Sequence, residues 1–409
     1  MQKDYQQYYR QKAIPQLKEL LTNYGPLGII WFDTPGGMTK QQTQNFINEL
    51  RVLQPKSLFS SRVGHGLGDY VDFGDSEIPA APVNGAWESI FTHNDSWGYI
   101  QHDFNFKSSE QIIHILSEVA SKGGNLMLNV GPDGKGNFPY YSVKYLKETG
   151  AWLKKNGESI YGSTYGFIPK QTWGVTTAKP GKLFLHVWNR PFNEKVLVPG
   201  FSNQVSKVYT LVGKKALPFS KKSKDLDVDM SSIIDNKSPN TVIVVEYSGK
   251  PQALNSTQPI TVSSQYAENI IDAVFAKTTG KANVKKFTHS SYFGVWHHTT
   301  CVADMKSPED STSFAIRITE PGDYKLTLEY SCADEDSKQE GVLTIGGKKF
   351  MFETLRTAKH ETWKPMLFIK HAVAIFSTDK PGLFNVTIRP YQKGKELFKL
   401  KSIIVEPIK

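Results

Sequence analysis

Hydrophobic residues in the first 160 positions form short apolar runs separated by segments of helical periodicity. The run at 29–32 lies between Gly28 and a Pro-Gly-Gly turn, a pattern typical of a parallel strand buried on both faces. Three further strands are predicted at 57–60, 87–92 and 125–130. Helices are predicted at 5–21, 40–53, 108–121 and 141–155. Pro15 predicts a kink in the first helix, or a helix start near Ile14. Strands that alternate with helices indicate a parallel α/β sheet or barrel.

From about Tyr165 onward, the pattern changes to strict alternation of apolar and polar residues. The runs 182–187 and 241–247 predict an antiparallel β-domain over 166–250. The segment 248–259 is rich in Ser, Gly, Pro, Asn and Gln and is interpreted as a linker, so few contacts are expected across it. A second antiparallel β-sandwich is predicted over 259–409, from strands at 324–330, 341–345 and 384–389.

Composition narrows the possible partners of this 409-residue chain. The formal net charge is +10, but the lysines are scattered as singles and pairs over predicted β-strands, so a solvated surface is expected and nucleic-acid binding is not. The 12% aromatic content suits sugar binding and a large core equally well. Cys301 and Cys332 are interpreted either as a bridge between strands or as two buried thiols. No metal site, cofactor site, membrane span or signal peptide is predicted.

Carboxylates gather where the predicted strands end. Asp33 directly follows the first strand, so its side chain is expected at the carboxyl edge, either as a catalytic group or as a helix cap. An acidic loop follows the second strand and contains Asp69, Asp72, Asp75 and Glu77, with Glu88 further on. Two acids on neighbouring strand ends are the minimum for glycoside hydrolysis, although acidic loops are often only solvated. Four further pocket candidates, each also interpretable as a packing residue, are His65, Trp87, His93 and Trp97.

Six sequence blocks, in this order, resemble the α-L-fucosidases of glycoside hydrolase family 29. They are Leu21-Thr-Asn-Tyr-Gly-Pro-Leu-Gly-Ile-Ile-Trp-Phe-Asp33, Gly68-Asp-Tyr70, Asp75-Ser-Glu-Ile-Pro79, Trp87-Glu88, Asn94-Asp-Ser-Trp-Gly-Tyr99 and Gly123-Gly-Asn-Leu-Met-Leu-Asn-Val-Gly-Pro132. The resemblance covers roughly residues 5–165. Trp173-Gly174 and the 183–187 segment resemble the β-domain that follows in that family, and the last sandwich loosely resembles accessory modules of bacterial glycosidases.

The resemblance implies a retaining exo-hydrolase that removes terminal α-L-fucose from glycans through a covalent fucosyl-enzyme. It implies that Asp33 is the nucleophile and that Asp75 is the first choice for the general acid/base, with Glu88 and Glu77 as alternatives. The residues expected to contact substrate are Trp31, Arg62, His65, Trp87 and Trp97. The family implies no cofactor and no metal. It also suggests a periplasmic, secreted or lysosome-like location, which the sequence itself does not encode.

Compared with that family, the sequence lacks the early half of the barrel. The expected fold class is therefore a partial (β/α)8-like, TIM-type barrel over 1–165, followed by the two β-sandwiches, the last of which is a candidate carbohydrate-binding module. The chain is interpreted as a fragment or as a natural split or decayed form, with self-association through open barrel edges as one consequence. We do not expect this chain alone to hydrolyse fucosides at a useful rate. The alternative is a non-catalytic carbohydrate-binding remnant.

Overall fold

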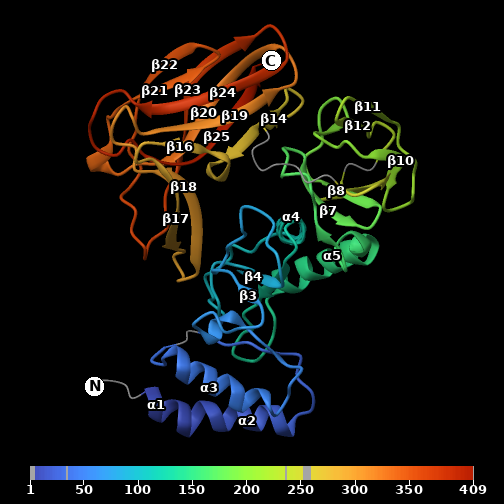
Figure 1. Ribbon diagram of the computed structural model, residues 1–409, viewed down its shortest axis with the longest axis vertical. Helices are drawn as coiled ribbons and strands as arrows, with labels where there is room; N and C mark the ends of the chain where they lie inside the picture. The colour runs from blue at the N-terminus through green and yellow to red at the C-terminus, as the bar shows by residue number, and fades with distance from the viewer. Residues whose placement is uncertain (1–4, 34–35, 235–236, 252–258, 409) are drawn as a thin grey trace.

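Figure 1 shows three successive parts, from the N-terminal helices through a β-domain to a larger C-terminal β-domain. The computed structural model describes residues 5–33, 36–234, 237–251 and 259–408. Pro35 and most of the predicted linker lie outside the described residues. Among the residues that are described, no helix is both long enough and apolar enough to cross a lipid bilayer.

The predicted helices form, with bounds close to those expected. They are α1 (Tyr5–Tyr8), the π-helical turn η1 (Tyr9–Ala13), α2 (Ile14–Asn23), α3 (Lys40–Arg51), α4 (Ser109–Ala120) and α5 (Tyr140–Asn156), with short 3-10 turns η2 (Ser61–Val63) and η3 (Gly157–Ser159). Capping boxes at Thr39 and Ser108 begin α3 and α4. Residues 5–23 form one continuous helical segment, because the backbone stays right-handed helical through Ala13 and Ile14. The helix therefore does not start near Ile14; instead, the irregular π-helical turn η1 lies directly before Pro15.

The first part contains five short parallel strands. They are β1 (Ile29–Ile30), β2 (Leu58–Phe59), β3 (Val71–Asp72), β4 (Trp87–Thr92) and β5 (Asn125–Asn129). β1 pairs with β2, β3 with β4 and β4 with β5, all in parallel, and a parallel bridge from Ser60 to Tyr70 joins β2 to the β3 segment. Neighbours in sequence are therefore neighbours in space. All four predicted strands are present, and β3 inside the acidic loop is an addition. The expectation that the first strand is buried on both faces is wrong, because β1 is two residues long and its Ile29 is 51% exposed.

The middle part packs two antiparallel sheets face to face. Its strands are β6 (Thr164–Tyr165), β7 (Gly174–Lys179), β8 (Lys182–Val187), β9 (Lys195–Val198), β10 (Gln204–Thr210), β11 (Phe219–Lys222), β12 (Asp225–Asp229) and β13 (Thr241–Ser248). The sheet orders are β10-β13-β8-β7-β6 and β11-β12-β9. Alternate residues of both sheets share one buried core, while α5 covers the outer face of the larger sheet through Trp152, whose indole N–H donates to Asn240 O (3.0 Å).

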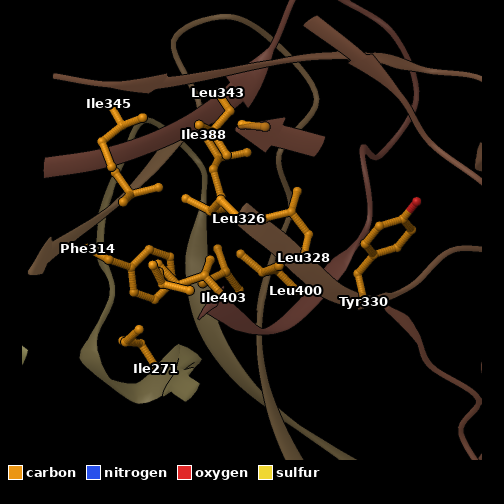
Figure 2. Packing of buried hydrophobic residues seen from close by; sticks show 14 of the residues in the cluster. Ile271, Phe314, Leu326, Leu328, Tyr330, Leu343, Ile345, Ile388, Leu400 and Ile403 are labelled. Atoms are coloured by element: carbon orange, nitrogen blue, oxygen red, sulfur yellow. The ribbon is translucent and has the colours of Figure 1, made fainter. Parts of the chain in front are cut away.

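The last part is a sandwich of two six-stranded sheets. Its elements are β14 (Ile260–Val262), β15 (Asn269–Asp272), η4 (Ala273–Phe275), β16 (Lys277–Thr279), β17 (Asn283–Ser290), β18 (Trp296–Ala303), β19 (Ser311–Ile318), β20 (Gly322–Ser331), η5 (Asp334–Asp336), β21 (Glu340–Ile345), β22 (Lys348–Glu353), β23 (Ile369–Thr378), β24 (Gly382–Pro390) and β25 (Lys399–Ile408). The sheet orders are β14-β19-β24-β21-β22, with β16 on β19, and β17-β18-β25-β20-β23, with β15 on β25. Figure 2 shows their shared core, where Phe314 and Leu343 of one sheet meet Leu326 and Ile403 of the other. Cys301 and Cys332 are both buried free thiols.

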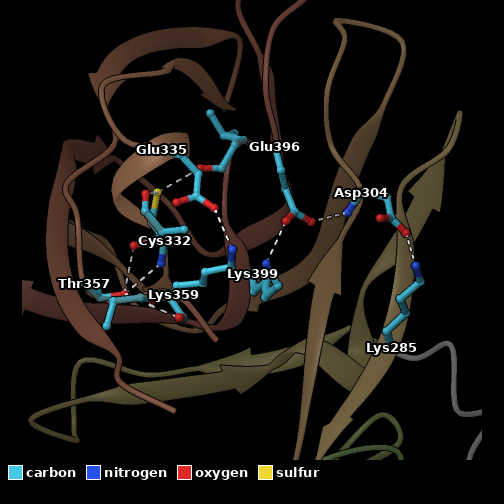
Figure 3. Close-up of polar contacts among 12 residues, drawn as sticks. Lys285, Asp304, Cys332, Glu335, Thr357, Lys359, Glu396 and Lys399 are labelled. Carbon is cyan, nitrogen blue, oxygen red and sulfur yellow. Dashed lines mark hydrogen bonds and ion pairs between the residues drawn. The ribbon is translucent and has the colours of Figure 1, made fainter. Parts of the chain in front are cut away.

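One hairpin, β17–β18, extends from this sandwich toward the N-terminal part of the chain (Figure 1). Figure 3 shows how the root of the hairpin is fastened: Lys285 pairs with Asp304, and the backbone N–H of Asp304 donates to Glu396 (2.8 Å). Lys399 completes the chain of contacts through its ion pair with Glu396 (2.8 Å). These contacts hold the hairpin at its base.

The expectation of few contacts between the last sandwich and the rest of the chain is wrong. Lys286 on β17 forms an ion pair with Glu77 (2.9 Å), and Ser291 at the hairpin tip donates to Asp95 O (2.8 Å). Further contacts bridge the middle and last parts: Arg317–Asp225, Phe192–Gln265 and Thr172–Asn269. The composition of the 248–259 segment carried no information on these contacts, because they are made by residues far from it in sequence.

Candidate active site

Arg62 organises the carboxylates at the ends of the parallel strands. It follows β2 in the turn η2, and its guanidinium contacts three acids: Nη1–Asp33 Oδ1 at 3.1 Å, Nη2–Asp75 Oδ1 at 2.6 Å and Nε–Asp72 Oδ2 at 3.0 Å. The guanidinium also lies over the Trp31 ring, 4.8 Å from its centroid. Because the two terminal nitrogens of one planar group contact Asp33 and Asp75, the two carboxylates lie on the same side of the site, close to each other. The structure thus brings together two acids that are 42 positions apart in sequence.

A second, deeper layer supports this cluster. Glu88 on β4 lies opposite Asp72 on β3 in the strand register. Glu88 Oε1 accepts from Trp31 Nε1 (2.6 Å) and from the hydroxyl of Tyr70 (3.2 Å). Since Trp31 is also covered by Arg62, this buried carboxylate fixes the indole on which the guanidinium rests. Glu88 therefore lies below the cluster and is committed to positioning Trp31.

Burial changes the ionisation of the acids in this layer. The Asp72 side chain is 0% exposed, and burial, together with the neighbouring Glu88 carboxylate, raises its pKa to about 6 against the opposing effect of Arg62. Burial and the charge of Glu88 also raise the pKa of Tyr70, so its hydroxyl stays protonated and can donate. Burial lowers the pKa of Arg62, but Asp75 and the other two carboxylates outweigh it, and the net change is upward. Arg62 therefore keeps its positive charge.

The last sandwich provides the opposite wall of the site. A cleft of about 390 Å³ is lined on one side by residues of the α/β part and on the other by the hairpin and by the strap 354–368 that connects β22 to β23. Its lining consists of Arg62, Asp72, Phe73, Gly74 and Asp75 opposite Thr288, Trp296, His298 and Thr362. The fit is close: a Cβ at Gly74 would lie 2.5 Å from His298 Nε2. The cleft therefore exists only because the two parts meet.

The other carboxylate named from sequence, Glu77, lies away from Arg62. It binds Lys286 through both oxygens (2.9 and 3.0 Å) and accepts from the backbone N–H of Gly74 (3.2 Å). This makes Glu77 part of the contact between the α/β part and the hairpin. Accordingly, the structure unites Asp33, Asp75, Arg62 and Trp31, and it places Glu77 in a structural ion pair.

The remaining pocket candidates lie outside the cleft lining. Trp87 is buried, packs edge to face on Phe73 (5.2 Å) and donates from Nε1 to Lys122 O (3.3 Å), so its ring is not presented to a ligand. His65 donates from Nε2 to a backbone carbonyl oxygen (2.8 Å). Trp97 is half-buried after β4. His93 is buried between Ser142 Oγ (2.9 Å) and a backbone carbonyl, as a satisfied core histidine.

Sequence reasoning missed the residues that come from the last sandwich. Thr288, Trp296 and His298 lie about 220 positions after the acidic loop, on strands whose alternation matches an ordinary sandwich. The only local signal is the Trp-His-His sequence at 296–298, which places polar and aromatic groups on half-buried strand positions. Asp72 was noticed as an acid, but its burial depends on the unexpected strand β3.

Comparisons with known proteins agree on one family. Residues 1–158 match the family model described as Alpha-L-fucosidase. The plasma alpha-L-fucosidase of Rattus norvegicus is 32% identical over 162 residues, which cover 37% of this chain and 35% of the relative. The alpha-L-fucosidase of Dictyostelium discoideum is 26% identical over 202 residues, covering 46% of this chain and 43% of the relative. The chain thus spans about a third of the length of the first curated relatives that it matches.

Solved structures extend the likeness beyond the first part. Alpha-L-fucosidase from Vibrio sp. strain EJY3 superposes with a TM-score of 0.70 at 24% identity, covering 99% of this chain and 71% of that chain, so the two share a fold over the sandwiches as well. Alpha-L-fucosidase isoenzyme 1 from Paenibacillus thiaminolyticus has a TM-score of 0.57 at 29% identity, covering 61% and 64%. Together with the motif blocks around Asp33, these matches show that residues 1–158 of this chain are similar to the α-L-fucosidase family.

Proposed function

We propose that this chain carries the nucleophile and the general acid/base of a retaining α-L-fucosidase, acting on terminal α-L-fucosyl groups of glycans. Residues 1–165 would form the carboxyl-terminal half of a (β/α)8-like barrel, with 166–250 as the following sandwich and 259–409 as the accessory sandwich. The observation that carries the proposal is the sharing of Arg62 between Asp33 and Asp75 at the strand ends. Retaining enzymes require two carboxyl groups about 5 to 5.5 Å apart, and such sharing supports a separation of that order.

Asp33 suits the role of nucleophile. Its side chain is 61% exposed, so a sugar can reach it, and the positive charge of Arg62 lies 3.1 Å away. A carboxylate must be ionised to attack, and a neighbouring cation favours the ionised form. In the first step, an Asp33 oxygen forms an ester bond to C1 of fucose, while the bond from C1 to the leaving oxygen breaks.

Asp75 suits the role of acid/base better than the other acids do, because it can reach a ligand. Its side chain is 13% exposed and lines the cleft, whereas Asp72 is sealed below it. Glu88 is occupied by Trp31 and Tyr70, and Glu77 is occupied by Lys286. Arg62 also contacts Asp75 (2.6 Å) and favours its ionised form, so this contact must loosen when substrate binds for Asp75 to hold a proton. In the first step Asp75 would then donate that proton to the leaving oxygen, and in the second it would take a proton from the attacking water.

The direct test is covalent trapping. The chain is incubated with a 2-deoxy-2-fluoro-fucosyl fluoride. Asp33 is expected to displace the fluoride at C1, and the resulting ester hydrolyses slowly enough to be detected. The incubation is long, because the trapped ester accumulates even when the reaction is too slow for useful hydrolysis by this chain alone. Intact-mass spectrometry followed by peptide mapping should find one added sugar, on Asp33. Asp33→Asn should remain unlabelled, while Asp133→Asn, a change at an exposed turn, should label like the unmodified chain. A label on a different residue would reject the nucleophile assignment.

One observation favours a second candidate, a carbohydrate-binding protein without turnover. The exposure of Asp33 contrasts with the closed, water-excluding sites in which glycosyl transfer is usually performed. The same experiment separates the two candidates, because a binding protein would retain the fluorosugar reversibly and show no mass increase after denaturation.

A further inference from the structure

The hairpin β17–β18 crosses the edge of the parallel strands at which Asp33 and Asp75 lie. It is attached there at two points. Lys286 binds Glu77 in the loop after β3, and Ser291 Oγ donates to Asp95 O in the loop after β4. These loops leave the carboxyl ends of the strands, where catalytic groups collect in α/β barrels. The hairpin is therefore part of the wall of the site.

The strap 354–368 packs against this hairpin and also reaches the cleft. His360 donates from Nε2 to Thr288 O (3.0 Å), and the backbone N–H of Met366 donates to His289 Nδ1 (3.4 Å). At the start of the strap, the backbone N–H of Leu355 donates to the hydroxyl of buried Tyr330 (2.9 Å). These contacts hold the strap at both ends, so the residues between them, including Thr362 and Trp363, have a defined place beside the cleft.

Two tryptophans meet at this place. The rings of Trp296 on β18 and Trp363 on the strap lie 4.8 Å apart at an angle of 55°. Trp296 lines the cleft, while the Trp363 residue is 76% exposed. An indole this exposed adds little to the core, yet it offers a broad apolar face with a polar N–H at its edge. Pyranose rings have apolar faces ringed by hydroxyls, and thus match such a surface.

The position of the cleft relative to the fucosyl bond determines whether it would hold fucose or the sugar to which fucose is attached. Asp75 lines the cleft and Asp33 does not. A general acid contacts the leaving oxygen, whereas the nucleophile contacts C1 from the opposite face of fucose. A cleft that begins at Asp75 and continues to Trp296 therefore lies on the leaving-group side of the fucosyl bond. Thr288 and His298 line it as a hydrogen-bonded pair (Oγ1 to Nδ1, 3.0 Å), Thr362 adds a further hydroxyl, and burial lowers the pKa of His298.

We propose that the hairpin and the strap bind the sugar to which fucose is attached, with Trp296 and Trp363 as the stacking surface. The proposal rests on the assignment of fucosidase chemistry, because that chemistry defines the two sides of the bond. It gives the last sandwich a role in choosing among fucosylated glycans. In this proposal the last sandwich contacts glycan at the active-site cleft, and the role does not depend on a second carbohydrate-binding site on the sandwich.

The test measures binding, so it does not depend on turnover. The full chain is titrated by calorimetry with L-fucose, with lactose and N-acetyllactosamine as defucosylated acceptors, and with α1,2- and α1,3-fucosylated forms of both. Trp363→Ala is compared with Tyr391→Ala, which removes another exposed ring of the same sandwich outside the cleft. Thermal melting verifies that both variants fold, as expected for exposed side chains.

We expect the unmodified chain to bind at least one defucosylated acceptor. Trp363→Ala should weaken acceptor binding about tenfold, the size of effect typical of an interfacial tryptophan, and should lower the ratio of oligosaccharide affinity to fucose affinity. Tyr391→Ala should match the unmodified chain. If no acceptor binds, or if both variants bind acceptors equally, the proposal is overturned. Failure of fluorosugar labelling together with Trp363-dependent acceptor binding would instead reject turnover and retain the sugar site.

Discussion

Replacing Asp72 by asparagine should remove a pH-dependent loss of stability. In the folded chain, burial raises the pKa of Asp72 from 3.8 to about 6. Below pH 3.8 the folded and unfolded states both hold the proton, and between about pH 4 and 6 only the folded state does. The free energy of unfolding therefore falls as pH rises through this window, because the folded state then gives up a proton that it binds more tightly.

The size of the effect follows from the pKa difference. A shift of about two units, at about 1.4 kcal/mol per unit, corresponds to a loss of about 3 kcal/mol between pH 4 and pH 7. Asparagine has nearly the same shape and no titrating proton, so Asp72→Asn should lack this loss. Relative to the unmodified chain, the variant should gain stability progressively as pH rises toward 7, and the gain should be constant above that.

Urea unfolding followed by tryptophan fluorescence, at several pH values from 4 to 8, measures this difference. Contributions from the two sandwiches are common to both proteins and cancel. Asp133→Asn is a control in which the pH dependence of the difference in unfolding free energy should have the opposite sign. Hydrogen bonds from Asn137 and its neighbours lower the pKa of Asp133, so its ionised form stabilises the folded state. A difference between Asp72→Asn and the unmodified chain that stays constant over the whole pH range would refute the reasoning.

Three further predictions concern the site. Asp75→Ala, in a form of the enzyme that turns over, should slow hydrolysis of natural fucosides by 100-fold or more, with aryl fucosides less affected and azide restoring the second step; the same pattern in Glu77→Ala alone would reassign the acid/base. Lys286→Ala should leave Glu77 without its partner and weaken acceptor binding in calorimetry, since the hairpin loses an attachment; unchanged binding would contradict this. Gly74→Ala should perturb the imidazole of His298 in NMR spectra, because the new Cβ would lie 2.5 Å from Nε2, whereas Gly98→Ala has open space and should not.

The sequence predicted the α/β part well because its signals are local. Apolar runs and helical periodicity correctly located β4, β5, α4 and α5 to within two residues. Asp33 and Asp75 also lay on motifs, so their approach at a strand edge could be anticipated. Strand β3 escaped detection because a two-residue strand within a loop of glycines and aspartates has no periodicity to read.

The second wall of the site could not be predicted, for a different reason. The Lys286–Glu77 pair joins residues separated by 209 positions, and each is an ordinary charged residue in its own segment. Likewise, Trp296 and Trp363 come from a strand and a strap that no local pattern connects. The composition of the 248–259 segment led to the wrong expectation of few contacts between the last sandwich and the rest of the chain. A linker-like sequence at a domain boundary carries little information on contacts that other residues make.

The attachment of the hairpin restricts how the two ends of this chain can vary in sequence. Because Glu77 and Asp95 receive the hairpin, the loops after β3 and β4 and the C-terminal sandwich must change together. A one-residue insertion near Gly74 would move the receiving loop against His298, so it would be tolerated only with a matching change in β18. If the hairpin and strap bind the acceptor sugar as proposed, exchange of the sandwich between relatives should transfer glycan preference only when the loops after β3 and β4 are exchanged with it.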